Sequence, residues 1–154
     1  MLSRSGIADW YITLNRSPLS PPNVVFAPVW TLLYIMIAIS GWTIWRQQKT
    51  MPHLTPIKSL YIIQLILNWS WTPLFFYYHL IGSALICLLL LNFFIAAVIC
   101  FCYNRIKVVS LLIAPYFVWT LFASYLNFYI TTIIDVFISQ LSDIRQIFQR
   151  AMFQ

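Results

Sequence analysis

Three long stretches of the chain carry no Lys, Arg, Asp or Glu. They run over residues 17–45, 59–104 and 108–134. A helix crosses the hydrocarbon layer with about 20 apolar residues, so the first and third stretches fit one span each. The middle stretch would measure about 69 Å as one helix, more than twice the membrane thickness, and must therefore fold back. The pattern predicts four transmembrane helices, over about 24–46, 58–78, 82–104 and 108–134.

The fold-back in the middle stretch is predicted at residues 77–83. Aromatic residues there suit the membrane interface, and Gly82 is the residue that bends most easily. Three prolines, Pro28, Pro73 and Pro115, lie inside the apolar stretches. Membrane helices tolerate internal proline because neighbouring groups satisfy the freed carbonyls, so these prolines do not divide the spans further.

The segment 135–154 differs from the spans because its apolar residues follow a helical period. They recur at steps of three and four residues, at Phe137, Leu141, Ile144, Phe148 and Ala151. Charged and amide side chains are set away from this stripe. The spacing predicts an amphipathic helix that is too polar to span a membrane. We expect it to lie on the membrane surface, with a seam for a partner helix as the alternative.

The composition excludes an ordinary soluble domain. Hydrophobic residues make up 62% of the 154 residues and charged residues 8%, against about 25% charged in a typical globular chain. With a mean hydropathy of +0.83, too few polar side chains remain to cover a globule of this size in water. We therefore expect a single all-α membrane domain over 1–154, a bundle of four transmembrane helices followed by the amphipathic tail.

The net charge of +6 comes from nine Lys and Arg residues against three Asp and no Glu. The basic residues are spread along the chain without a continuous patch, which favours boundaries of membrane spans over nucleic-acid binding. The loops over 46–58 and 104–108 are basic, so the positive-inside rule places both in the cytoplasm and both termini on the other side. Three cysteines in apolar stretches, without a CxxC pair, indicate neither a disulfide framework nor a zinc site.

Polar and aromatic residues share faces on three of the predicted helices. Steps of three and four residues bring them together on the first helix (Trp30, Tyr34, Ala38, Gly41 and Trp45), the second (Tyr61, Gln64, Asn68, Trp71 and Phe75) and the fourth (Tyr116, Trp119, Ala123 and Asn127). Such faces suit an apolar ligand pocket with a few orienting hydrogen bonds. They equally suit contacts between helices, in which Asn and Gln hydrogen-bond across the bundle.

Conventional catalytic groups are scarce. The three aspartates, Asp9, Asp135 and Asp143, lie at or beyond the ends of the spans, so the membrane interior holds no carboxylate pair or proton relay. His53 in a loop and His79 at a turn each stand alone, which is typical of structural histidines. Three glycines are too few for a phosphate-binding loop. We expect no bound metal and no cofactor.

The aromatic faces lie in three sequence blocks that match a known family pattern. The blocks are Pro21-Pro22 with VFAPVWTLLY at 25–34, NWSWTPLFF at 68–76, and PYFVWTLFASYLN at 115–127. Together with Trp10-Tyr11 they keep their order and spacing over about 10–128. The sequence resembles the translocator protein family, also called TspO or peripheral-type benzodiazepine receptor.

The resemblance implies an α-helical membrane protein, often a homodimer, that binds tetrapyrroles such as protoporphyrin IX as well as sterols and synthetic isoquinoline or benzodiazepine ligands. Some bacterial members resemble enzymes that degrade porphyrin in light, with two pocket tryptophans implicated, which by position are Trp30 and Trp119. Asn68 and Asn127 would orient or support the pocket. Combined with the helix faces, the resemblance predicts a ligand-binding set of Trp30, Tyr34, Gln64, Asn68, Trp71, Trp119, Ala123 and Asn127.

The sequence also departs from the family pattern. The family has five spans and only nine residues precede Trp10, so the chain either is a four-helix variant lacking the first transmembrane helix or begins late. Leu19, Val24 and Cys102 stand where the family has tryptophan. The animal sterol motif needs a basic residue soon after its tyrosine, and none follows Tyr129 closely, which weakens the case for sterol binding.

These features favour an integral membrane receptor or carrier that binds a protoporphyrin IX-like tetrapyrrole in a pocket between helices. Two alternatives stay open: a light-dependent porphyrin-degrading enzyme that uses Trp30 and Trp119, and a regulatory membrane subunit whose pocket has decayed. The expected partners are membrane lipid, the tetrapyrrole and a second copy of the chain, without nucleic acid. The expected location is the bacterial cytoplasmic membrane, or the mitochondrial outer membrane if the source is eukaryotic.

Overall fold

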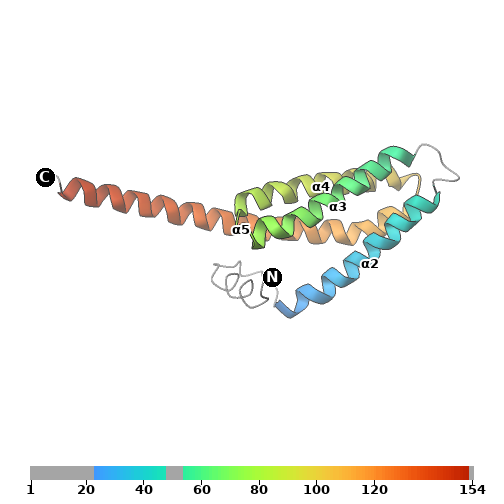
Figure 1. Ribbon diagram of the computed structural model, residues 1–154, viewed down its shortest axis with the longest axis horizontal. Helices are drawn as coiled ribbons and strands as arrows, with labels where there is room; N and C mark the ends of the chain where they lie inside the picture. Colours follow the sequence, from blue (N-terminus) through green and yellow to red (C-terminus); the bar gives the residue numbers. More distant parts are fainter. Residues whose placement is uncertain (1–22, 48–53, 153–154) are drawn as a thin grey trace.

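The computed structural model describes the backbone of residues 23–47 and 54–152, with side chains as far as residue 133. The secondary structure in this part of the chain is helical (Figure 1). The helices are α2 (Asn23–Gln47), α3 (Thr55–Phe76), α4 (Ile81–Tyr103) and α5 (Lys107–Met152). The all-α fold class is confirmed, and a helix lies over each of the four segments that the charge-free stretches predict.

Three of these helices are long and apolar enough to cross a membrane, namely α2, α4 and the first part of α5, Lys107–Ile133. With 22 residues, α3 is about 33 Å long and also reaches across a hydrocarbon layer. It is less apolar than the others because it carries Gln64 and Asn68, and both of these side chains are buried in the bundle. The amides of α3 are therefore kept away from lipid, as polar groups in membrane helices usually are.

The central helix of the bundle is α4, which packs against α3 on one side and α5 on the other. Helix α2 lies along α5 and touches α3 at few points, and it diverges from α3 toward its own N-terminal end (Figure 1). Buried aliphatic side chains such as Leu91, Ile95 and Ile113 fill the space between the helices. Because lipid tails are as apolar as these side chains, close packing and hydrogen bonds hold the helices together.

One such hydrogen-bonded contact joins α4 to α5 at Asn92. Its amide oxygen accepts a hydrogen bond from Oγ1 of Thr120 at 2.7 Å, and its amide nitrogen donates to Oγ of Ser124 at 2.8 Å. All three side chains are buried. Asn92 thus acts between helices rather than in a pocket. The sequence analysis did not single it out, because α4 is apolar on every side and gives no periodic signal.

Helices α2 and α3 meet closely at Gly41 and Tyr61. The Tyr61 hydroxyl donates a hydrogen bond to the carbonyl oxygen of Ile37 at 2.7 Å, and a Cβ added at Gly41 would lie 2.5 Å from that hydroxyl. Only glycine leaves room for the tyrosine ring at this point. This is the small-residue packing that lets membrane helices approach each other.

We expect Gly41→Ala to destabilise the fold, because the new methyl group displaces Tyr61 and breaks its hydrogen bond to Ile37. Overpacking of this kind costs about 1–3 kcal/mol, which thermal unfolding in detergent micelles resolves. Gly82→Ala is the matched control, because no atom lies within 4 Å of the Cβ added there. Its stability should stay unchanged or rise slightly. Equal stability of the two variants would contradict close packing at Gly41.

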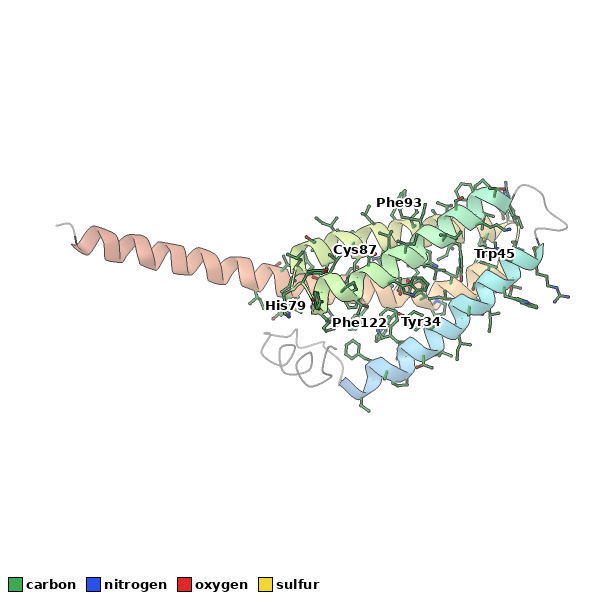
Figure 2. All side chains as sticks on the ribbon, viewed as in Figure 1. Tyr34, Trp45, His79, Cys87, Phe93 and Phe122 are labelled. Atoms are coloured by element: carbon green, nitrogen blue, oxygen red, sulfur yellow. The ribbon has the colours of Figure 1, made fainter. Side chains whose placement is uncertain are left out.

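The turn between α3 and α4 lies where the sequence predicts it, but the chain reverses at a different residue. Because α4 begins at Ile81, Gly82 belongs to its first turn and is not the bend. The left-handed residue is His79, with a φ of 54°, and the backbone N–H of Leu80 donates to the carbonyl oxygen of Leu74 at 3.0 Å. Histidine is among the residues that adopt this conformation more often than most. His79 lies at the end of the bundle opposite Trp45 (Figure 2).

The fourth span and the amphipathic tail form one continuous helix. Helix α5 runs unbroken for 46 residues, about 69 Å, and extends well beyond the other helices (Figure 1). The sequence analysis separates a span over 108–134 from a tail over 135–154, and the structure has no break between them. No Gly or Pro follows Pro115, so nothing in the sequence interrupts the helix. The location of the tail on the membrane surface stays a prediction.

Candidate functional site

A cavity of about 360 Å³ lies between α2, α3 and α5. Its walls come from the N-terminal half of α2, the C-terminal half of α3 and the middle of α5, where α2 diverges from α3 (Figure 1). The residues that line it are Phe26, Trp30, Tyr34, Asn68, Trp71, Thr72, Phe75, Phe76, Trp119, Ala123, Leu126, Asn127 and Ile130. An aromatic and aliphatic lining with a few polar groups is typical of sites for apolar ligands.

Aromatic rings from three helices form the walls of this cavity. Phe26 of α2 packs edge-on against Trp119 of α5, with 5.9 Å between ring centroids. Trp30 stacks on Tyr34 at 5.4 Å, and Trp71 stacks at the same distance on the phenylalanine four residues further along α3. A spacing of four residues puts each stacked pair on one side of its helix. The flat faces that a planar ligand needs are therefore supplied by α2, α3 and α5 together.

Asn68 connects the same three helices by hydrogen bonds. The Tyr34 hydroxyl of α2 donates to the Asn68 amide oxygen at 3.1 Å, and the Asn68 amide nitrogen donates to the Tyr116 hydroxyl of α5 at 2.7 Å. Asn68 and Tyr116 are buried, whereas Tyr34 is 42% exposed and lines the cavity. Asn68 therefore holds one wall of the cavity, the Tyr34 ring, in a fixed position relative to α3 and α5.

Three other polar groups are buried without a hydrogen-bond partner in the described part of the chain. They are both amide atoms of Gln64, both amide atoms of Asn127 and the indole nitrogen of Trp71. Gln64 is 1% exposed and Asn127 is 2% exposed. Unpaired buried polar groups are costly and uncommon in native proteins. Asn127 and Trp71 belong to the cavity lining, so the site keeps unused hydrogen-bonding capacity next to its apolar walls.

Most residues predicted from the sequence do lie around this cavity. Trp30, Tyr34, Asn68, Trp71, Trp119, Ala123 and Asn127 all line it. Gln64 does not, because it lies one helical turn from Asn68 toward the packed core. Ala38 and Trp45 on α2 are exposed on the outside of the bundle, so only the first part of the predicted α2 face belongs to the site.

Sequence reasoning missed six lining residues: Phe26, Thr72, Phe75, Phe76, Leu126 and Ile130. The periodic signal was present for several of them. Phe26 precedes Trp30 by one helical turn, and Ile130 follows Asn127 by three residues. Phe75 was on the predicted face of the second helix but was not assigned to the site. Extending the faces of the first and fourth helices by one turn includes Phe26 and Ile130, and the face of the second helix already includes Phe75.

Among the residues that the structure describes, the lining contains no acidic, basic, histidine or cysteine side chain. Elsewhere among the described side chains, no cluster of three potential metal ligands occurs. What the cavity offers is stacking on aromatic faces, a small number of amide, hydroxyl and indole groups beside them, and three oxidisable indole rings, those of Trp30, Trp71 and Trp119.

The apolar helices and the aromatic cavity between them define an integral membrane protein of the helical-bundle class. The chain belongs to the TspO/MBR family, whose family model matches residues 1–133.

Relatives from animals, archaea and bacteria agree with this assignment. The chain is 35% identical over 121 residues to the translocator protein of Bos taurus, which covers 77% of this chain and 71% of the bovine protein. It is 35% identical over 122 residues to the tryptophan-rich protein TspO of Archaeoglobus fulgidus, covering 79% and 78% of the two chains. It is 29% identical over 120 residues to the tryptophan-rich sensory protein of Cereibacter sphaeroides, covering 78% and 73%.

Proposed function

We propose that this protein is a membrane receptor or carrier that binds a tetrapyrrole such as protoporphyrin IX in the cavity between α2, α3 and α5. The observation that carries the proposal is the convergence of Trp30, Trp71 and Trp119, from three different helices, on one apolar cavity. Membership of the TspO/MBR family supports a tetrapyrrole-related role in a membrane. The relatives' names, translocator protein and tryptophan-rich sensory protein, support transport or sensing of a ligand.

The chemistry of a porphyrin matches the cavity lining. A porphyrin is flat and mostly apolar, so stacking and burial dominate its affinity, and each aromatic pair contributes about 0.5–1.5 kcal/mol beyond the buried area. A volume of about 360 Å³ is at the lower end of the usual range for ligand sites, so the cavity encloses part of the macrocycle. The propionates stay at the water-facing mouth, because carboxylates are costly to bury and none of the described lining residues is a cation.

A second candidate function is light-dependent degradation of the bound porphyrin. The specific observation in its favour is that Trp30 and Trp119 both line the cavity and thus both face the same ligand. Indole stacks on a porphyrin face and is readily oxidised. The third interpretation, a regulatory subunit with a decayed pocket, is less favoured because the cavity keeps its aromatic walls.

Titration of the purified protein with protoporphyrin IX in the dark tests the proposed binding. We expect saturable quenching of tryptophan fluorescence and a shift of the porphyrin absorption band. Trp71→Ala should weaken binding by about two- to tenfold, because one stacking face is lost. Trp69→Ala is the matched control on the same helix, since Trp69 is 65% exposed and does not line the cavity. Non-saturable quenching, or an equal effect of both variants, would contradict the proposal.

The family and the apolar helices support integration in a membrane, and we assign the bacterial cytoplasmic membrane as the proposed location. The basic residues at the ends of α2 and α4 support an orientation with these ends in the cytoplasm. The homodimer that the family resemblance implies stays a prediction.

A further inference from the structure

Cationic side chains that are scattered along the sequence come together at one end of the bundle. The structure describes four Lys and Arg side chains, and these are Arg46 at the end of α2, Lys58 near the start of α3, and Arg105 and Lys107 at the turn from α4 to α5. Antiparallel packing of successive helices brings these four positions to the same end. We call this group the basic end.

No described acidic side chain balances the basic end. None of the residues with described side chains is Asp or Glu. At the opposite end, the turn over 77–80 contains tyrosines, a histidine and a leucine but no Lys or Arg. The described part of the bundle is therefore strongly asymmetric in charge along its long axis. Clustered cations beside an apolar surface create a local potential that attracts anions.

Two exposed tryptophans hold the cations of α2 and α3 beside the outer surface of the bundle. The Arg46 guanidinium lies 5.0 Å from the centre of the Trp42 ring, and the Lys58 ammonium lies 5.0 Å from the centre of the Trp45 ring. Trp42 is 61% exposed and Trp45 is 44% exposed. Tryptophans at the ends of spans favour the depth of the lipid headgroups. Cation–π contacts at this distance are attractive and keep the two charges at that depth.

We propose that the basic end binds the phosphate headgroups of anionic phospholipids, with Arg46 and Lys58 as the principal contacts. A guanidinium and an ammonium from adjacent helices offer several donors to one phosphodiester. The indoles of Trp42 and Trp45 offer apolar surface to the first carbons of the acyl chains. The positive charge of the basic end, its location at the depth of the headgroups and its exposed indole surface all fit a lipid. A soluble polyanion would interact with the positive charge alone. This site is separate from the cavity and does not depend on the proposed function.

Lipid selectivity of the full chain in vesicles tests this proposal. The protein is reconstituted in mixed vesicles of phosphatidylcholine and phosphatidylglycerol, and spin-labelled forms of each lipid report the fraction immobilised by the protein. We expect a preference for phosphatidylglycerol that declines as salt is raised. In Arg46→Gln/Lys58→Gln the preference should fall by about fivefold for each cation removed, which is on the order of twenty-five-fold for both. Arg46→Lys/Lys58→Arg keeps both charges and should keep most of the preference.

Arg4→Gln/Arg16→Gln removes the same charge from the segment that precedes the first predicted span and serves as the control for net charge. It should keep more of the preference than the basic-end variant. If Arg46→Gln/Lys58→Gln does not give a helical, monodisperse protein, Arg105→Gln/Lys107→Gln takes its place in the comparison. Equal association of the two lipids with the parent chain would overturn the proposal. An equal loss in the basic-end and control variants would overturn it too.

Discussion

A chain carrying Trp30→Phe and Trp119→Phe is expected to bind protoporphyrin IX nearly as well as the parent chain and to lose light-driven breakdown of the ligand. Phenylalanine keeps an aromatic face, and each aromatic pair contributes only about 0.5–1.5 kcal/mol beyond buried area, so Kd changes little. The benzene ring is much harder to oxidise than indole. A breakdown reaction that takes electrons from the indoles of Trp30 and Trp119 should therefore stop in the variant, even though the aromatic rings at these two positions still line the cavity.

Loss of the porphyrin absorption band under illumination measures this reaction, with free protoporphyrin IX in the same detergent as the baseline. Trp42→Phe/Trp45→Phe is the matched control, because it makes the same change at two tryptophans outside the cavity. Breakdown at the parental rate in Trp30→Phe/Trp119→Phe would refute the assigned role of these residues. If protoporphyrin IX breaks down no faster with the parent chain than it does free in detergent, reception or transport of the ligand remains the function.

Asn68→Leu is expected to reduce both the stability of the fold and the affinity of the cavity. The substitution removes the hydrogen bonds to Tyr34 and Tyr116, and the Tyr116 hydroxyl stays buried without that partner. Such an orphaned group costs about 1–3 kcal/mol. Loss of the Asn92 side chain should destabilise the fold less than loss of Asn68. Its partner Thr120 keeps a second acceptor for its hydroxyl, a carbonyl oxygen of its own helix at 3.1 Å. Tyr34, once released, no longer defines the cavity wall, so porphyrin affinity falls as well.

Thermal unfolding and porphyrin titration of the same samples measure the two effects. Asn104→Leu is the control for the change of residue type, because Asn104 is exposed at the end of α4. Adding Tyr116→Phe to Asn68→Leu should recover much of the stability, since replacing both partners leaves no buried unpaired group. The affinity should stay low, because Tyr34 is still untethered. Wild-type stability of the Asn68→Leu single variant would contradict the role of this hydrogen-bonded connection.

The helices and most of the site could be predicted from the sequence because both depend on short-range periodicity. Charge-free stretches fix where helices lie, and steps of three and four residues put Asn68 beside Trp71 and Trp119 beside Ala123. Periodicity does not fix the rotation of a helix against its neighbours. Gln64 is therefore predicted to line the cavity but lies toward the packed core, and Trp45, which shares the predicted face of α2 with Trp30, is exposed.

Features that depend on contacts between distant segments could not be predicted in the same way. Asn92 of α4 forms its hydrogen bonds with Thr120 and Ser124 of another helix, and the apolar sequence of α4 has no periodic pattern that predicts these hydrogen bonds. The basic end itself follows from the sequence, because the basic loops over 46–58 and 104–108 are predicted on one side of the membrane. The contact of Lys58 with Trp45 does not, because it joins side chains of two different helices. The bend at His79 instead of Gly82 reflects where α4 begins, and helix ends are poorly fixed by composition.

Binding in the cavity is tested most directly by a substitution that fills the cavity without removing any aromatic residue. Ala123 lines the cavity, so the larger side chain in Ala123→Phe occupies space that the ligand needs. Ala38→Phe makes the same change on the exposed side of α2 and serves as the control. In titrations with protoporphyrin IX, the account predicts saturable binding for the parent and Ala38→Phe and strongly weakened binding for Ala123→Phe. Equal affinity of the parent and a folded Ala123→Phe variant would contradict binding in the cavity between α2, α3 and α5.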